Sequence, residues 1–161
     1  MIASDAVKTA LTYTKNAPHD AIILGLGQSW DYAQLQKACN LIAEHDLPVI
    51  LCQPDAYCPD PNGNIPDSGA LMALIETTLY RKVPTIVIGK PNKAFVEPVF
   101  ASTDIPRNRA IIFGDRLRTD MATADACGIT GALVLTGETK RKDVTDDMNY
   151  IVLDDLNDLF S

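Results

Sequence analysis

Short apolar runs alternate with amphipathic stretches along most of this chain. The runs over 21–27 and 48–53 have the length and composition of buried strands, whereas the stretch that begins at Asp31 repeats apolar residues at helical spacing. Elements that alternate in this way form βα units with largely parallel strands, because each helix returns the chain to the same edge of the sheet. The sequence therefore predicts an α/β fold.

The same periodicity predicts the other elements and one unusual loop. Residues 54–69 are rich in Pro, Asp, Asn and Gly, and the segment is too long to be a simple connector, so we expect a binding loop there. Ser68 can cap the helix that follows it. The remaining predicted elements are helices over 4–15, 70–79, 92–101 and 119–127, strands over 84–89, 110–113, 131–135 and 150–153, and a short terminal helix.

Composition excludes several classes of protein. The 161 residues are 47% hydrophobic and 22% charged, which suits one domain or two small lobes. A net charge of -7 disfavours binding to nucleic acid or to anionic membrane surfaces. No apolar run approaches the ~20 residues that span a bilayer, and residues 1–16 are too polar for a signal peptide. We expect a soluble, cytoplasmic protein whose four cysteines, which form no CxxC pair, are reduced and bind no zinc.

The segment GDRLRTD, from Gly114 to Asp120, is the most informative stretch of the sequence. It follows an apolar strand and precedes a helix, so Asp115 and Asp120 lie at the carboxyl end of a parallel strand, where open α/β sheets bind ligands. Mg²⁺ prefers oxygen ligands and needs only one or two carboxylates when the substrate supplies a phosphate. The pattern therefore predicts a metal-binding loop in which Thr119 caps the helix. The alternative is an ordinary turn followed by an acidic first helical turn.

Lys90 follows another predicted strand, in the tripeptide GKP. A lysine in this place can contact a phosphoryl oxygen and a carboxylate together. The alternative is a lysine that is simply solvated at the surface. Two further features carry no prediction of a site: GLGQS at 25–29 lacks the spacing of either glycine-rich phosphate-binding motif, and His19 and His45 are isolated at turn positions.

GKP, GDRLRTD and LVLTGET occur in this order, and together they resemble the haloacid dehalogenase superfamily. The chain is most similar to the NagD-like and 4-nitrophenyl phosphatase-like branch, which has a large α/β cap. The resemblance implies a Rossmannoid parallel sheet, a Mg²⁺-dependent hydrolysis of a small phosphorylated metabolite, and a role for three residues. Lys90 would steady the nucleophile and the phosphoryl group, Asp115 would bind Mg²⁺, and Asp120 would orient Asp115 or a water on the metal.

The segment QPDAYCPDPNGNIPDSGAL resembles part of the cap in that branch. The resemblance implies that Tyr57, Cys58 and Pro59 reach over the substrate. The chain departs from the family at two cap positions, since Gln53 replaces the usual Asn or Thr and Asp67 replaces the usual Gly. The cap therefore gives little information about the identity of the substrate.

The largest departure is at the amino end. Family members begin with a strand and DxDGT, whose first Asp attacks phosphorus and whose second acts as acid and base, and the chain has no such segment and no Ser/Thr-ended strand upstream of the cap. We expect a cap-like lobe over 1–84 and the C-terminal half of an incomplete core over 85–161. The missing central strand would leave an open edge. A missing N-terminal segment, a partner chain or a homo-oligomer would complete the sheet.

Two other interpretations of the sequence remain open. The first is a non-catalytic phosphate-binding or metal-binding regulatory module that has no nucleophile. The second is a flavodoxin-like or receiver-like domain with acidic loops, which requires one continuous sheet in a single lobe. The phosphatase interpretation instead requires two lobes hinged near Pro84.

Overall fold

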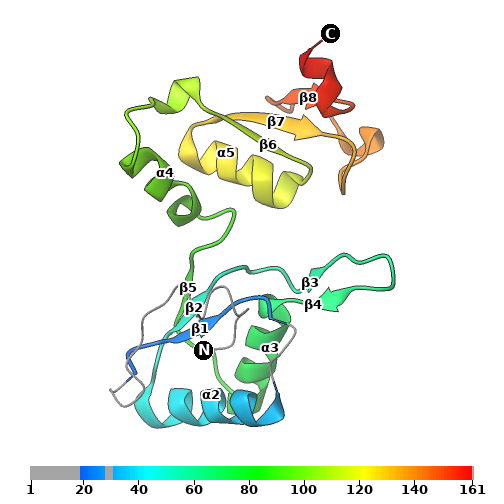
Figure 1. Cartoon of the computed structure of the whole chain (residues 1–161). Helices are drawn as coiled ribbons and strands as arrows, with labels where there is room; N and C mark the ends of the chain where they lie inside the picture. Colours follow the sequence, from blue (N-terminus) through cyan, green and yellow to red (C-terminus); the bar gives the residue numbers. More distant parts are fainter. Residues whose placement is uncertain (1–18, 28–30, 161) are drawn as a thin grey trace. The chain divides into compact units, whose positions relative to one another are not determined.

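The computed structural model describes residues 19–27 and 31–160, which form two compact units (Figure 1). Unit 1 comprises Met1–Gly89 and unit 2 comprises Lys90–Ser161. Each unit contains its own three-stranded parallel sheet, and unit 1 also contains a two-stranded hairpin. The helix predicted over 4–15 lies outside the described residues.

The sheet of unit 1 has the strand order β1-β2-β5, with β1 at Ile22–Leu24, β2 at Val49–Leu51 and β5 at Thr85–Val87. Successive side chains of a strand point to opposite faces, and the first and third residues of both β1 and β2 are buried. These side chains pack with α2, Tyr32–His45, and with α3, Ser68–Leu79. The fully buried side chains of this core are Leu24, Ile42, Val49 and Ile75.

Local capping explains where the two helices of unit 1 begin. The Asp31 carboxylate accepts a hydrogen bond from Gln34 N at 2.7 Å, as the predicted start of α2 requires. The prediction for α3 was wrong by one residue, because Asp67, and not Ser68, is the cap. Asp67 accepts from Ser68 N at 2.6 Å and is only 6% exposed. Ser68 is the first residue of the helix, and its hydroxyl donates to Gln53 O at 2.9 Å.

The turn-rich segment of unit 1 folds into a short antiparallel hairpin. Strand β3, Tyr57–Cys58, pairs with β4, Ile65–Pro66. Strands of two residues carry no detectable periodicity, which is why the sequence predicted only a loop.

The sheet of unit 2 has the order β6-β7-β8, with β6 at Ile111–Gly114, β7 at Thr130–Val134 and β8 at Ile151–Leu153. One face packs against helical elements through a small core of Val96, Cys127 and Ile129, to which Phe100 and Ile112 add partly buried side chains. Helix α5, Ala122–Cys127, ends at Gly128, whose φ of 65° is the left-handed conformation that favours glycine. The other helical elements are α4 at Glu97–Ala101, a π-helical turn at Leu117–Met121, and 3-10 turns at Lys93–Phe95, Arg107–Arg109, Arg141–Asp143 and Leu156–Leu159.

The sheet of unit 2 leaves apolar side chains exposed at its edges. Strand β6 pairs only with β7 among the described strands, and its Ile111 and Phe113 are 48% and 43% exposed. The register places Phe113, Ala132 and Ile151 in one row across the sheet, and Ile151 is 45% exposed. Neighbours in register share a face. The middle residue of this row, Ala132, is fully buried, so unit 2 exposes apolar side chains only at its two ends, Phe113 and Ile151.

The predicted α/β class with parallel sheets is confirmed. The two units divide between Gly89 and Lys90, five residues after the predicted boundary, so β5 pairs within unit 1. Two separate parallel sheets do not match the single continuous sheet of a flavodoxin-like domain. No helix in the described part of the chain is both long and apolar enough to cross a membrane.

Candidate phosphate and metal site

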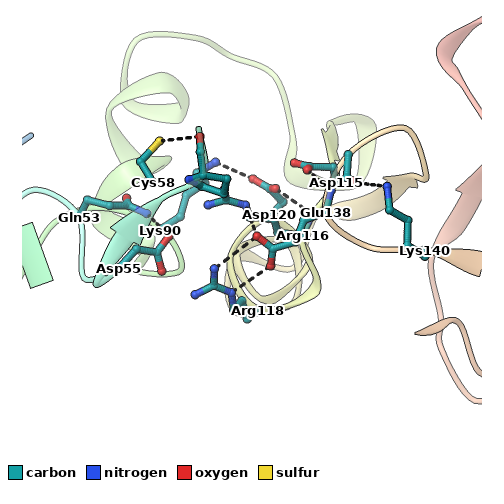
Figure 2. Close-up of polar contacts among 12 residues, drawn as sticks. Gln53, Asp55, Cys58, Lys90, Asp115, Arg116, Arg118, Asp120, Glu138 and Lys140 are labelled. Carbon is teal, nitrogen blue, oxygen red and sulfur yellow. Dashed lines mark hydrogen bonds and ion pairs between the residues drawn. The ribbon is translucent and has the colours of Figure 1, made fainter. Parts of the chain in front are cut away.

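The acidic loop of unit 2 starts at the carboxyl end of β6 and closes on itself through Asp120 (Figure 2). The peptide N–H of Arg116 donates to Asp120 Oδ2 at 3.2 Å, and Asp120 N donates to Arg116 O at 3.1 Å. Gly114 permits this closure, since a Cβ there would collide with the Asp120 carboxylate. The chain then enters a π-helical turn, a conformation that is frequent at functional sites.

Thr119 does not cap the helix, although the sequence predicted that it would. It lies inside the π-helical turn and is 3% exposed, and its carbonyl accepts the Thr123 hydroxyl at 2.6 Å. Its own hydroxyl oxygen is buried without a hydrogen-bond partner in the described structure. The reason for the error is that the loop is closed by Asp120, so the cap position of an ordinary helix start does not exist here.

Lys90 and Asp120 form an ion pair within unit 2. Lys90 Nζ lies 2.6 Å from Asp120 Oδ1, and the side chains are 32% and 7% exposed. Lys90 Nζ also lies 5.7 Å from the centre of the Phe95 ring. Lys90 is thus fixed against the acidic loop, and the alternative of an unattached, solvated lysine does not describe its position.

Asp115 is partly buried at the end of the same loop. Its Oδ2 accepts from the peptide N–H of Glu138 at 2.7 Å, and its carbonyl accepts from Thr139 N at 3.0 Å. Its Oδ1 has no partner within residues 19–27 and 31–160. One carboxylate oxygen of Asp115 is therefore available to a ligand, whereas both oxygens of Asp120 are engaged by Lys90 and Arg116.

The turn after β7 supplies residues that the sequence analysis did not assign to a site. Glu138 accepts from Arg116 Nε at 3.0 Å and from Arg118 Nε at 3.3 Å, so both guanidinium groups are held beside the acidic loop. Figure 2 shows Glu138 among these two arginines and Asp115. The available signal was the pairing of two parallel strands, because the loops that follow such strands leave the sheet at the same edge.

The residues present suit a hard divalent cation, although they provide only part of a ligand set. The described residues contain no cluster of three or more His, Cys, Asp or Glu side chains that could hold a metal ion. Mg²⁺ commonly binds one or two carboxylates and completes its coordination with water and substrate phosphate. The open Oδ1 of Asp115 fits the role of one such ligand, and Asp120, whose oxygens are engaged, fits a role in holding the loop.

Tyr57, Cys58 and Pro59 belong to the hairpin of unit 1 and are described separately. Tyr57 is 41% exposed, and Cys58 Sγ contacts Pro59 O at 3.9 Å. All four cysteines are free thiols, and burial raises the pKa of Cys39 and of Cys52. Of the predicted site residues, Lys90, Asp115 and Asp120 therefore lie in unit 2, whereas Tyr57, Cys58 and Pro59 lie in unit 1.

Comparison with known proteins agrees with this geometry. Residues 87–159 match the HAD-hydrolase-like family. The chain is 30% identical to chronophin from Bos taurus over 73% of this chain and 39% of that protein. It is 32% identical to glycerol-3-phosphate phosphatase from Gallus gallus over 77% of this chain and 40% of that protein. The chain thus spans about two fifths of the length of these curated relatives.

A solved structure matches both units. The 4-nitrophenylphosphatase from Thermotoga maritima is 33% identical, with a TM-score of 0.82, over 95% of this chain and 58% of that protein. By these matches the chain is similar to the haloacid dehalogenase superfamily, and within it to NagD-like and 4-nitrophenylphosphatase-like proteins. The chain corresponds to the C-terminal part of such proteins, as the sequence predicted.

Proposed function

We propose that this chain is part of a Mg²⁺-dependent phosphomonoester hydrolase. The observation that carries the proposal is the arrangement of Lys90, Asp115 and Asp120 at the carboxyl end of β6, with Asp115 Oδ1 open and Lys90 fixed by Asp120. Two similar proteins, glycerol-3-phosphate phosphatase and 4-nitrophenylphosphatase, are named for the hydrolysis of small phosphorylated compounds and support the same reaction. The substrate would be a small sugar, nucleotide or aryl phosphate, and the site of action the cytoplasm.

The residues of this chain would bind and orient the phosphoryl group. The Lys90 ammonium would neutralise charge that develops on the phosphoryl oxygens, and Asp120 would hold that ammonium in place at 2.6 Å. Asp115 would bind Mg²⁺, which would stabilise the phosphoryl charge as a Lewis acid when bound. The attacking carboxylate would lie outside these 161 residues and form an aspartyl-phosphate, since the sequence contains no DxDGT-like segment.

Substrate contact from unit 1 is assigned to the hairpin. Tyr57, Cys58 and Pro59 lie where β3 ends and the turn toward β4 begins, and the half-exposed Tyr57 ring offers an apolar surface. Aromatic side chains of this kind contribute large contact areas to ligand recognition. We therefore propose that this hairpin contributes to specificity.

The open edge of β6 supports completion by additional polypeptide. An edge strand offers unpaired N–H and C=O groups to another strand, and Ile111 and Phe113 beside it are about half exposed. A missing N-terminal segment, a partner chain or a second copy could supply the strand. Each would cover the exposed Ile111 and Phe113 side chains and bring further groups to the edge where Asp115 lies.

A chimaera would test the proposed reaction. The part of the Thermotoga maritima phosphatase that has no counterpart here would be joined to this chain, and hydrolysis of 4-nitrophenyl phosphate would be measured with Mg²⁺ and with EDTA. We expect Mg²⁺-dependent turnover that Asp115→Asn abolishes and Lys90→Ala reduces by at least about a hundredfold. Turnover that survives Asp115→Asn would overturn the assignment of Asp115.

A second candidate is a non-catalytic module that binds phosphate or a divalent cation. The absence of a DxDGT-like segment from the 161 residues favours it. Calorimetric titration of the chain alone with Mg²⁺ and inorganic phosphate would separate the two functions. A regulatory module should bind both tightly without any other polypeptide, whereas one part of a hydrolase should bind them weakly.

A further inference from the structure

The turn after β7 and the acidic loop after β6 are joined by contacts that run in both directions. Glu138 N donates to Asp115 Oδ2 at 2.7 Å, and Thr139 N donates to Asp115 O at 3.0 Å. In the opposite direction, Arg116 Nε donates to the Glu138 carboxylate at 3.0 Å. The dipeptides 115–116 and 138–139 therefore hold one another in a fixed register.

Gly137 makes this approach possible. A Cβ at Gly137 would collide with the Asp115 carboxylate, so the turn can approach Asp115 only without a side chain at this position. As a result, the peptide N–H of residue 138 engages Oδ2 and leaves Oδ1 open. The position of this turn decides which oxygen of Asp115 is available.

The Glu138 side chain anchors the turn to both parts of the acidic loop. Arg116 directly follows Asp115, and Arg118 lies in the π-helical turn that contains Asp120. The Glu138 carboxylate accepts from both, and its side chain is 37% exposed. An ion pair with this exposure adds little to stability, so positioning and local charge are its main contributions.

We propose that Glu138 is a positioning residue that sets the Asp115 carboxylate for binding a divalent cation. It does so through its peptide N–H, whose place is fixed by the contacts of its carboxylate with Arg116 and Arg118. The inference rests on the proposed function, because it assumes a cation at Asp115. Partners that orient a metal ligand change metal affinity by about 10-fold to 100-fold.

Binding of Mn²⁺ to the full chain tests the proposal. Mn²⁺ affinity would be measured by paramagnetic relaxation of water protons, and residue 138 would be followed by its amide proton shift in the absence of metal. The variants are Glu138→Gln, which removes the charge, and Glu138→Asp, which keeps the charge but shortens the side chain. Glu97→Gln is the matched control, because Glu97 also holds an arginine, Arg107, in an exposed ion pair of unit 2.

We expect both Glu138 variants to bind Mn²⁺ about tenfold more weakly than the natural chain, with an upfield shift of the residue 138 amide proton. Glu97→Gln should leave both quantities unchanged. Wild-type affinity in Glu138→Asp would show that charge alone matters and would overturn the positioning role. Loss of affinity in Glu97→Gln equal to that in Glu138→Gln would also overturn it.

Two controls separate this proposal from the proposed function. If the natural chain binds Mn²⁺ and Asp115→Asn abolishes binding while Glu138→Gln does not weaken it, the metal site stands and the role of Glu138 is wrong. If the natural chain binds no Mn²⁺ at all, the metal site itself is wrong, and the role of Glu138 is wrong with it. Should Glu138→Gln fail to fold, Glu138→Asp carries the test by itself, because it keeps the charge and withdraws the carboxylate from Arg116 and Arg118.

Discussion

Both units contain an acidic loop after a parallel strand, but they use their carboxylates differently. After β2 in unit 1, Asp55 Oδ2 accepts from Gln53 Nε2 at 2.9 Å and Asp67 caps α3, and both side chains are buried. After β6 in unit 2, Asp120 pairs with Lys90 and Asp115 keeps one oxygen open. A strand followed by acidic turn residues therefore does not define a ligand site. The site requires a carboxylate oxygen that the fold itself does not use.

The largest expected effect on stability comes from two ion pairs of equal length, one in each unit. Lys90–Asp120 in unit 2 and Lys82–Glu76 in unit 1 both measure 2.6 Å, but Lys90 and Asp120 are 32% and 7% exposed, whereas Lys82 and Glu76 are 92% and 19% exposed. Lys90→Met should cost about 2–3 kcal/mol of unfolding free energy, because it leaves a buried carboxylate without its cation. Lys82→Met should cost less than about 1 kcal/mol. Urea unfolding followed by amide hydrogen exchange reports each unit separately, and equal costs would contradict the distinction.

Two glycines test whether close packing serves the same purpose in both loops. An added Cβ would lie 2.6 Å from Asp120 Oδ2 at Gly114, and 2.6 Å from Asp55 O at Gly69. Each change to Ala should destabilise its own unit by about 1–2 kcal/mol, because the neighbouring atoms must move. Only Gly114→Ala should also weaken Mn²⁺ binding. Equal loss of Mn²⁺ binding in Gly69→Ala would contradict the assignment of the site to unit 2.

Substitutions of Asp67 and Asp115 compare a carboxylate that stabilises the fold with one that is proposed to bind a ligand. Asp67→Ala removes the cap of α3 and should cost about 1 kcal/mol without any change in cation affinity. Asp115→Asn keeps an oxygen that can accept from Glu138 N, so it should change stability by less than about 0.5 kcal/mol while abolishing Mn²⁺ binding. Thermal unfolding and relaxation titrations on the two variants measure both effects. The comparison fails if Asp67→Ala weakens the cation site.

The smallest expected effect is a pH dependence of stability that arises from Asp125, a carboxylate of unit 2 that accepts a hydrogen bond from Tyr150. Tyr150 OH donates to Asp125 Oδ2 at 2.6 Å, and this bond, with burial, raises the pKa of Tyr150 to about 12 from its ordinary value of 10.0. A raised folded-state pKa contributes stability that is fully present below pH 10.0 and is lost as pH rises toward about 12. The stability difference between the natural chain and Tyr150→Phe should therefore be constant below pH 10.0 and should shrink above it. A difference that grows with pH would refute the role of this bond.

Local signals in the sequence were sufficient for much of the fold. Asp31 begins α2 and Gly128 ends α5 because capping depends only on nearby residues. The cap of α3 was misassigned because Asp67 and Ser68 are adjacent and both are good capping residues. The hairpin within 54–69 was missed because its strands have two residues each. Elements with several turns or a single dominant cap are therefore predictable, and short ones are not.

The candidate site was predictable only in part. Lys90, Asp115 and Asp120 were found because they follow strands and match family motifs, and the structure places Lys90 against Asp120 although they are 30 residues apart. Glu138 was not assigned, because its role depends on how two loops approach across neighbouring parallel strands. The closeness of that approach depends on Gly137, and a glycine in sequence does not reveal which side chain lies against it.

The exposed side chains of Phe113 and Ile151 on unit 2 have a consequence for how the chain behaves in solution. Exposed apolar side chains draw copies of a protein together, while a net charge of -7 keeps them apart. Salt screens the repulsion over a distance of about 8–10 Å at ordinary ionic strength but does not weaken the apolar attraction. Added salt should therefore make the isolated chain associate, and a polypeptide that covers these two side chains should make the chain insensitive to salt.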